Sequence, residues 1–128
     1  MKKLLVVDDD PDICQLLKVV LEAYHFTVDI ATNGQEALEH VRAEVPDGIF
    51  LDLRMPVMDG WAALNVLQRD YPAVIVIVIT ASRTGDVVHH VRARGAQGCV
   101  LKPFDPHELR ATLREAFGWT PEPGAAHG

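Results

Sequence analysis

Short apolar runs alternate with helical patterns five times along the chain, and this alternation constrains the fold more than any other feature. The apolar runs are residues 4–7, 26–30, 48–53, 74–79 and 99–101. After each run, apolar residues recur at the three- and four-residue spacing of an amphipathic helix. Strands that are separated by helices pair in parallel, so the pattern predicts an α/β fold: a parallel sheet with helices on both faces.

The composition of the runs predicts where each strand lies in the sheet. Residues 74–79 are six β-branched residues in a row, and residues 48–53 are almost entirely apolar. Such runs are typical of strands that are buried on both faces. Residues 26–30 alternate between apolar and polar side chains, which indicates a half-buried strand nearer the edge of the sheet.

Capping residues and glycines mark the expected ends of the helices. Helix starts are predicted at Asp10, Asn33 and Asp105, and helix ends at Gly95 and Gly118. A proline follows both Asp10 and Asp105, at the first helical position. The expected helices are about 11–25, from 34 to Pro46, from 61 onward, about 86–94, and 106–117.

Length and composition limit the class of protein. The chain has 128 residues, 48% of them hydrophobic and 23% charged, as expected for one globular domain. We place that domain at residues 1–118 and expect a flexible tail or the start of a linker at 119–128. Twelve basic and 18 acidic residues give a net charge of −6, which argues against binding nucleic acid or an anionic membrane surface. The apolar runs are too short to span a membrane, and the two cysteines are expected to be reduced, as in the cytoplasm.

Four of the five predicted strands end in charged or reactive side chains. Asp8 and Asp9 follow the first run, Asp52 lies near the end of the third, Thr80 follows the fourth, and Lys102 follows the fifth. The carboxyl ends of parallel strands meet at one edge of a sheet, and ligands bind there. We therefore expect these five residues to share a site.

The residue types at this edge favour phosphoryl chemistry. Two unit charges about 4 Å apart repel by about 4 kcal/mol at an effective dielectric of about 20, so clustered carboxylates need a cation. Mg²⁺ prefers oxygen ligands, and Lys102 supplies a second positive charge. A cation, an ammonium group and the Thr80 hydroxyl together suit a phosphoryl group. Asp52, on a buried strand, is the candidate nucleophile that would form an aspartyl phosphate.

Four segments together resemble the receiver domain of two-component response regulators. They are LVVDDDP at 5–11, LDLRMPVMDG at 51–60, VITA at 78–81 and VLKPF at 100–104. The resemblance extends over residues 2–117. It implies a flavodoxin-like, doubly wound sheet with strand order 2-1-3-4-5 and five flanking helices. It also implies that a histidine kinase, or a phosphotransfer protein of a phosphorelay, passes a phosphoryl group to Asp52.

The resemblance also assigns roles to single residues. Mg²⁺ would be bound by the carboxylates of Asp9 and Asp52 and by the backbone carbonyl of Arg54, with Asp8 assisting. Thr80 and Lys102 would contact the phosphoryl group, and the Lys102–Pro103 peptide bond would be cis.

The chain departs from the family pattern at one position and carries two further positions of interest. Cys99 occupies a position where the family commonly has an aromatic residue that takes part in switching. We expect the output to depend instead on the backbone after Thr80 and on the fourth helix. Arg54 and Ser82 match positions that line the path of attacking water, so we expect them to modulate the lifetime of the aspartyl phosphate.

The function expected from these residues is a phosphoacceptor switch. It would promote its own phosphorylation and slow hydrolysis in the cytoplasm but turn over no external substrate, so it is not an enzyme in the usual sense. Its effector is unknown, and the domain would be a monomer or a weak dimer through the face of helix 4, strand 5 and helix 5.

Three alternative functions remain at this stage. A haloacid-dehalogenase-type phosphatase uses a similar residue set but needs a second aspartate two positions after the nucleophile, where this chain has Arg54. A flavodoxin-like flavin binder needs a hydroxyl-rich phosphate loop, whereas Asp8 and Asp9 would repel a phosphate. A pseudo-receiver that is never phosphorylated would not need the intact set of site residues.

Overall fold

The computed structural model describes residues 2–53, 60–81 and 85–120, without the side chains of 85–87. The strands are β1 (Lys3–Val7), β2 (Thr27–Ala31), β3 (Gly48–Asp52), β4 (Ile75–Thr80) and β5 (Gly98–Leu101). The helices are α1 (Pro11–Ala23), α2 (Gly34–Ala43), α3 (Gly60–Asp70), α4 (Gly85–Ala93) and α5 (Pro106–Phe117). The predicted alternation of five strands and five helices is confirmed.

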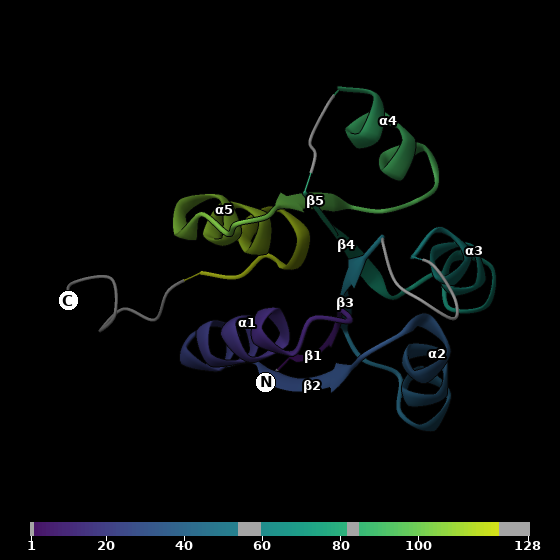
Figure 1. The fold of residues 1–128 in the computed structure, drawn as a ribbon, viewed down its shortest axis with the longest axis horizontal. Coiled ribbons are helices and arrows are strands. Elements are labelled where there is room, and N and C mark those ends of the chain that lie inside the picture. Colours follow the sequence, from purple (N-terminus) through teal and green to yellow (C-terminus); the bar gives the residue numbers. More distant parts are fainter. Residues whose placement is uncertain (1, 54–59, 82–84, 121–128) are drawn as a thin grey trace.

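The strands form one parallel sheet in the order β2-β1-β3-β4-β5. This is the order that the family resemblance implies. The chain runs from β1 outward to β2, returns past β1 to β3, and then continues to β4 and β5 (Figure 1). The direction of strand order therefore reverses between β1 and β3. In doubly wound sheets, the crevice beyond the carboxyl ends of these two strands is where ligands bind.

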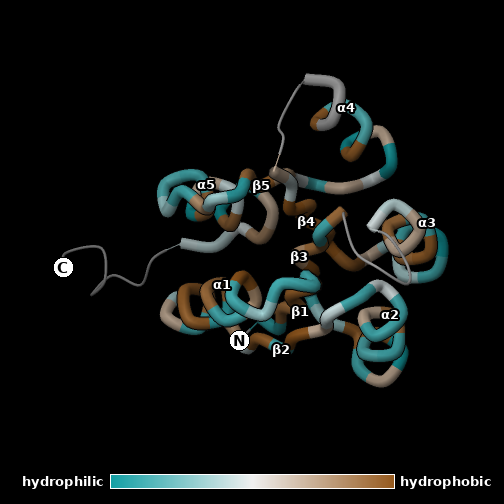
Figure 2. The backbone as a smooth tube through the Cα atoms, in the orientation of Figure 1, coloured by the Kyte–Doolittle hydropathy of each residue, from teal (hydrophilic) through white to brown (hydrophobic). Residues whose placement is uncertain are grey.

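Burial along the strands follows the predicted positions. Every residue of β3 is buried, as is every residue of β4 after Ile75. β2 lies at an edge and is only partly covered, with Thr27 exposed. The helices divide the core into two layers, one under α1 and α5 and the other under α2, α3 and α4. Figure 2 shows the resulting pattern: the strands are hydrophobic, and each helix has hydrophilic stretches.

The predicted helix caps are present. The side chains of Asp10 and Asp105 accept hydrogen bonds from the backbone N–H two residues ahead, and Asn33 accepts one from Glu36 N–H at 2.8 Å. The Glu36 carboxylate in turn accepts from the backbone N–H and the hydroxyl of Thr32, both at 3.2 Å. These contacts fix where α1, α2 and α5 begin.

Element boundaries differ from the prediction by a few residues. α1 ends at Ala23 rather than near residue 25, because His25 adopts a left-handed φ of 71° and turns the chain toward β2. α2 ends three residues before Pro46, and α4 begins at Gly85, one residue earlier than predicted. β3 ends at Asp52 because the carbonyl of Leu53 accepts from Gly60 N–H instead of joining the sheet.

The end of the described chain packs against the domain. Gly118 ends α5 in the left-handed conformation, with φ of 64°. The ring of Trp119 lies 5.0 Å from that of Tyr24, and its Nε1–H donates to the Tyr24 carbonyl at 3.3 Å. The boundary at residue 118 stays a prediction, and most of the predicted tail lies outside the described residues. Among the described helices, none has both the length and the apolarity to cross a membrane.

Candidate functional site

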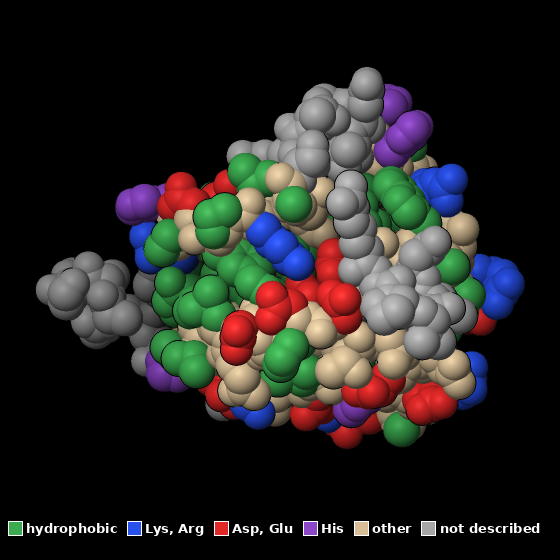
Figure 3. All heavy atoms as spheres, viewed as in Figure 1, with side chains coloured by type: hydrophobic (Ala, Val, Ile, Leu, Met, Phe, Trp, Pro, Cys, Tyr) green, Lys and Arg blue, Asp and Glu red, His purple; other side chains and the backbone are tan. Residues whose placement is uncertain are grey.

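The predicted site residues converge at the carboxyl edge of the sheet. Asp8 directly follows β1, Asp52 is the last residue of β3, Thr80 is the last residue of β4, and Lys102 directly follows β5. Figure 3 looks onto this edge and shows acidic side chains gathered in the middle of the face, with a basic side chain beside them. Residues separated by more than 90 positions thus come together through the order of the strands.

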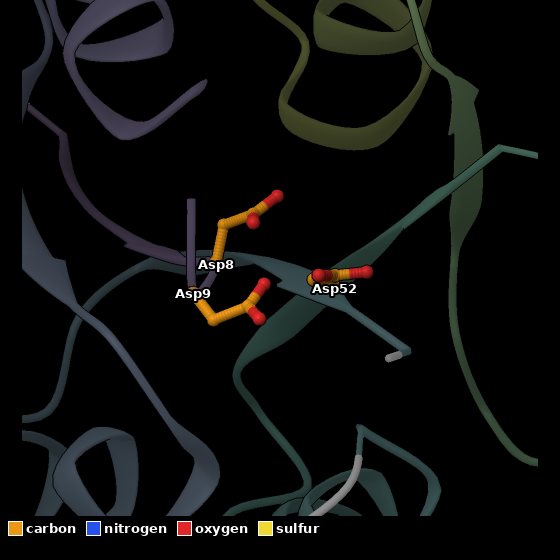
Figure 4. Close-up of side chains that lie close together, drawn as sticks. All are labelled: Asp8, Asp9 and Asp52. Atoms are coloured by element: carbon orange, nitrogen blue, oxygen red, sulfur yellow. The ribbon is translucent and has the colours of Figure 1, made fainter. Parts of the chain in front are cut away.

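The three carboxylates form a compact cluster. One oxygen each from Asp8, Asp9 and Asp52 lies within 4.8 Å of the other two. Figure 4 shows the side chains of Asp8 and Asp9 leaving the end of β1 and extending toward Asp52 at the end of β3. Asp8 is 0% exposed and Asp52 5% exposed, whereas Asp9 is exposed. The cluster is therefore buried on one side and open to solvent on the other.

Lys102 partly compensates the negative charge. Its Nζ lies 2.7 Å from Oδ2 of Asp8 and 3.6 Å from Oδ2 of Asp52. Burial lowers the pKa of Lys102, whereas the hydrogen bond to Asp8 and the charge of Asp52 raise it, and together these carboxylates outweigh burial. The pKa therefore lies above its ordinary value of 10.5, so the side chain is an ammonium group at neutral pH.

Asp8 is held from several directions. Its backbone N–H donates to Ala31 of β2 at 3.2 Å, and its Oδ1 accepts from the N–H of Asp10 at 2.9 Å. Its backbone carbonyl accepts from the thiol of Cys14, on α1, at 3.2 Å. Burial, followed by the nearby charge of Asp8, raises the pKa of the Cys14 thiol to about 11, so the thiol keeps its proton.

The donor set fits a small divalent cation. Three carboxylates against one ammonium leave two negative charges at the site. Oδ2 of Asp8 is fully buried, and the ammonium group of Lys102 contacts it at 2.7 Å. An all-oxygen site with one open side is what Mg²⁺ prefers, because this ion keeps several waters. Asp8, Asp9 and Asp52 are the described residues that could hold it.

Thr80 lies next to the cluster on the neighbouring strand. In the sheet register Asp52 is opposite Ile79, so Thr80 is one residue further along β4. Thr80 is 9% exposed, and its carbonyl accepts from the N–H of Lys102 at 2.8 Å. This bond ties the end of β4 to the residue that carries the ammonium group.

The other residues singled out in the sequence are partly described by the structure and partly outside the described residues. Cys99 is buried on β5, in the core layer under α2, α3 and α4. The Lys102–Pro103 peptide bond is cis, as the family resemblance implies. Arg54 and Ser82, including the Arg54 carbonyl predicted as a metal ligand, lie outside the described residues. Sequence reasoning did not assign a role at the site to Cys14; its place in the first turn of α1 was the available signal, since helical side chains point back toward the helix start.

Gly60, at the start of α3, lets that helix approach the end of β3 closely. A Cβ atom at this position would lie 2.2 Å from the carbonyl oxygen of Asp52 and 2.5 Å from Cα of Leu53. Its N–H donates to the Leu53 carbonyl at 3.1 Å. The backbone that carries Asp52 is thus packed directly against the start of α3.

Comparisons with known proteins agree with this arrangement. Residues 4–114 match the family model of the response regulator receiver domain. The chain is 37% identical over 117 residues to the transcriptional regulatory protein ZraR of Escherichia coli, and 39% identical over 113 residues to the DNA-binding response regulator MtrA of Mycolicibacterium smegmatis. These alignments cover 91% and 88% of the chain but only 26% and 49% of the two relatives.

Solved structures of response regulators have a similar fold. The fold matches that of the chemotaxis protein CheY4 of Vibrio cholerae with a TM-score of 0.85 and 30% sequence identity, over 91% of this chain and 99% of CheY4. The family match spans nearly all the strands and helices described above, and the acidic cluster lies at the edge where the strand order predicted it. The chain therefore belongs to the response regulator receiver domain family of two-component systems.

Proposed function

We propose that this domain is a phosphoacceptor switch in which Asp52 receives a phosphoryl group from a histidine kinase or a phosphotransfer protein. The observation that carries the proposal is the setting of Asp52. Its carboxylate is almost buried at the carboxyl end of a central strand, 3.6 Å from an ammonium group and beside two further carboxylates. A nucleophile held in this way would be approached from the solvent side of the edge.

The transfer exchanges one bond to phosphorus for another. An oxygen of Asp52 attacks the phosphorus of a phosphohistidine, the P–N bond breaks, and its electron pair returns to the imidazole of the donor. The product is an acyl phosphate on Asp52. Lys102 offsets charge on the phosphoryl oxygens, and the Thr80 hydroxyl donates a hydrogen bond to one of them. Water later attacks the same phosphorus, which restores the carboxylate and releases inorganic phosphate.

Asp8, Asp9 and Asp52 would bind Mg²⁺, together with the predicted carbonyl ligand of Arg54. When bound, the ion neutralises charge on the transferring phosphoryl group and orients its oxygens. Since the domain would release only its own phosphoryl group, we infer that it has no further substrate.

We propose that three further residues modulate the switch without accepting the phosphoryl group or contacting it as Thr80 and Lys102 do. Arg54 and Ser82 would modulate how quickly water reaches the aspartyl phosphate. Cys99 is small, so it has little surface to move between a buried and an exposed position. The change of state would then depend on the backbone after Thr80 and on α4.

The partners are proposed to dock around the edge that carries the site. Figure 3 shows apolar side chains between α1 and α5 next to the acidic group, and on α1 Leu16 is 49% and Val19 64% exposed. A donor protein that presents a phosphohistidine to Asp52 would cover this surface. We propose that the domain is a monomer or a weak dimer through the face of α4, β5 and α5. It would act in the cytoplasm and make no direct contact with nucleic acid or membrane.

A mass measurement tests the proposal. The protein is incubated with acetyl phosphate and Mg²⁺, and the intact mass is recorded for the wild type, Asp52→Ala and Asp70→Ala. We expect one added phosphoryl group on the wild type and on Asp70→Ala, which lacks an exposed carboxylate paired with Arg69 on α3. Asp52→Ala should show none. A wild type that gains no mass would contradict the proposal and leave an unphosphorylated interaction domain.

A further inference from the structure

We infer that Cys14 is a positioning residue for the acidic cluster, an inference that rests on the proposed function of that cluster. Cys14 is 1% exposed and lies in the first turn of α1, among the core residues under α1 and α5. Its thiol donates to the backbone carbonyl of Asp8 at 3.2 Å. It is thus a core side chain that also contacts the backbone of the site.

The Asp8 carbonyl needs this donor. β1 ends at Val7, and the pairing of β1 with β2 and β3 also stops at Val7, so the next carbonyl has left the ladder. Buried carbonyls in native proteins nearly always have a hydrogen-bond partner. Among the described residues, the donor that the structure gives to this carbonyl is the Cys14 thiol.

A thiol suits this position better than the alternatives. The side chain must fill space in the apolar core that also contains Leu17 and Phe50, and it must offer a hydrogen to a carbonyl. Sulfur is large and weakly polar, and the S–H group is a weak donor, so one side chain meets both needs. Alanine would fill less space and donate nothing, whereas serine would keep the donor but on a shorter bond.

The orientation of this carbonyl affects two ligands at once. The peptide group that begins at the Asp8 carbonyl leads directly to Asp9, and the Asp8 carboxylate lies 2.7 Å from Lys102. The same turn includes the N–H of Asp10, which donates to Oδ1 of Asp8 at 2.9 Å. If the carbonyl is released, the peptide can rotate, and the distances of Asp8 and Asp9 to Asp52 become less defined. Cys14 therefore acts on the site through Asp8 and touches no substrate.

Three variants of the full chain test this role. Cys14→Ala removes the donor, Cys14→Ser retains one, and Leu17→Val removes a methylene from the same core, three residues further along α1. The measurements are the Mg²⁺ dissociation constant by calorimetry, the exchange rate of the Asp10 amide hydrogen by NMR in metal-free protein, and the urea midpoint of unfolding.

We expect Cys14→Ala to weaken Mg²⁺ binding by about tenfold and to speed Asp10 amide exchange by a similar factor, as loss of one hydrogen bond in the turn predicts. Cys14→Ser should recover both values to within about threefold of the wild type, because a hydroxyl still donates. Leu17→Val should lower the urea midpoint but leave both site measurements unchanged.

Two results would overturn the inference. One is a Cys14→Ala variant with wild-type Asp10 exchange; the other is a Leu17→Val variant that changes the site measurements as much as Cys14→Ala does. The proposed function fails separately: a wild type that binds no Mg²⁺ and accepts no phosphoryl group would contradict it, and the Asp10 exchange rates in metal-free protein would still decide the role of Cys14.

Discussion

The ammonium group of Lys102 contacts two carboxylates that come from different strands, and its contribution to stability depends on pH. Its pKa in the folded protein is raised above the ordinary value of 10.5 by Asp8 and Asp52, in spite of burial, which lowers it. The unfolded chain therefore loses this proton at a lower pH than the folded protein does. The stabilisation is fully present below about pH 10 and is lost as the pH rises through the pKa of the folded state.

We expect the pH dependence of this stabilisation to be measurable by comparing the wild type with Lys102→Met. The difference between their free energies of unfolding, from urea titrations, should be constant between about pH 7 and pH 9 and should shrink above about pH 10.5, because only the wild type has an ammonium group to lose. Comparing the two proteins removes the effect of the other lysines. A difference that stays the same up to pH 11.5 would show that the ion pairs add nothing to stability.

Most site residues could be predicted because their positions follow from where apolar runs end. Asp8, Asp52, Thr80 and Lys102 each end or directly follow a strand, so the parallel order of the strands alone brings them together. Cys14 could not be assigned this way, because a bond between its thiol and a backbone carbonyl depends on the exact turn between β1 and α1. Glu108 is similar: its carboxylate accepts from the N–H of Leu101 on β5, which no local pattern indicates.

At the scale of elements, α5 packs closely against β3 at Gly48, a residue that has no side chain. A Cβ atom at Gly48 would lie 2.3 Å from Cζ of Phe117, on the last turn of α5. Both residues are buried, so a methyl group at position 48 would force the ring of Phe117 to shift within the packed core. The glycine therefore sets how closely α5 packs on the sheet, beneath the strand that carries Asp52.

Gly48→Ala should destabilise the protein by about 1–3 kcal/mol, the usual cost of forcing extra atoms into a packed core. The double variant with Phe117→Leu should lose less than the sum of the two single variants, because the smaller side chain leaves space for the new methyl group. Urea unfolding of the four proteins measures this coupling. If the losses of unfolding free energy in the two single variants simply add up in the double variant, the ring of Phe117 and a side chain at position 48 do not compete for the same space.

The existence of the elements was predictable, whereas their ends were less so. Asp10, Asn33 and Asp105 cap helices by contacts within three residues, and such local contacts are visible in the sequence. The end of α1 depends instead on His25, which takes a left-handed φ where the sequence has no glycine. The end of β3 depends on a bond between Leu53 and Gly60, which the sequence pattern does not reveal.

For the whole molecule, the acidic cluster links metal binding to folding. The three carboxylates come from two separate segments, so they are close together only in the folded chain. A ligand that binds only the folded state stabilises it by an amount that grows with its concentration, about 1.4 kcal/mol at ten times the dissociation constant. Mg²⁺ should therefore raise the thermal midpoint of unfolding, and a chelator should reverse the effect.

The expected rise can be checked by calorimetric melting at increasing Mg²⁺ concentration. Asp9→Asn removes one proposed ligand and should show little or no rise, while Glu39→Gln, an exposed acid on α2, should behave like the wild type. K⁺ at matched ionic strength separates specific binding from general screening of the repelling carboxylates. If K⁺ and Mg²⁺ raise the midpoint equally, the cluster is not a divalent cation site.

The reversal of strand order between β1 and β3 also determines which fragments and circular permutants of this protein can form the site. The acidic cluster comes from the segment after β1 and from the end of β3, and the ammonium group beside it comes from the segment after β5. A fragment that lacks any of these three strands cannot assemble the full set of charges. A circular permutant with new termini between β2 and α2, by contrast, keeps all three strands intact and should keep the complete arrangement.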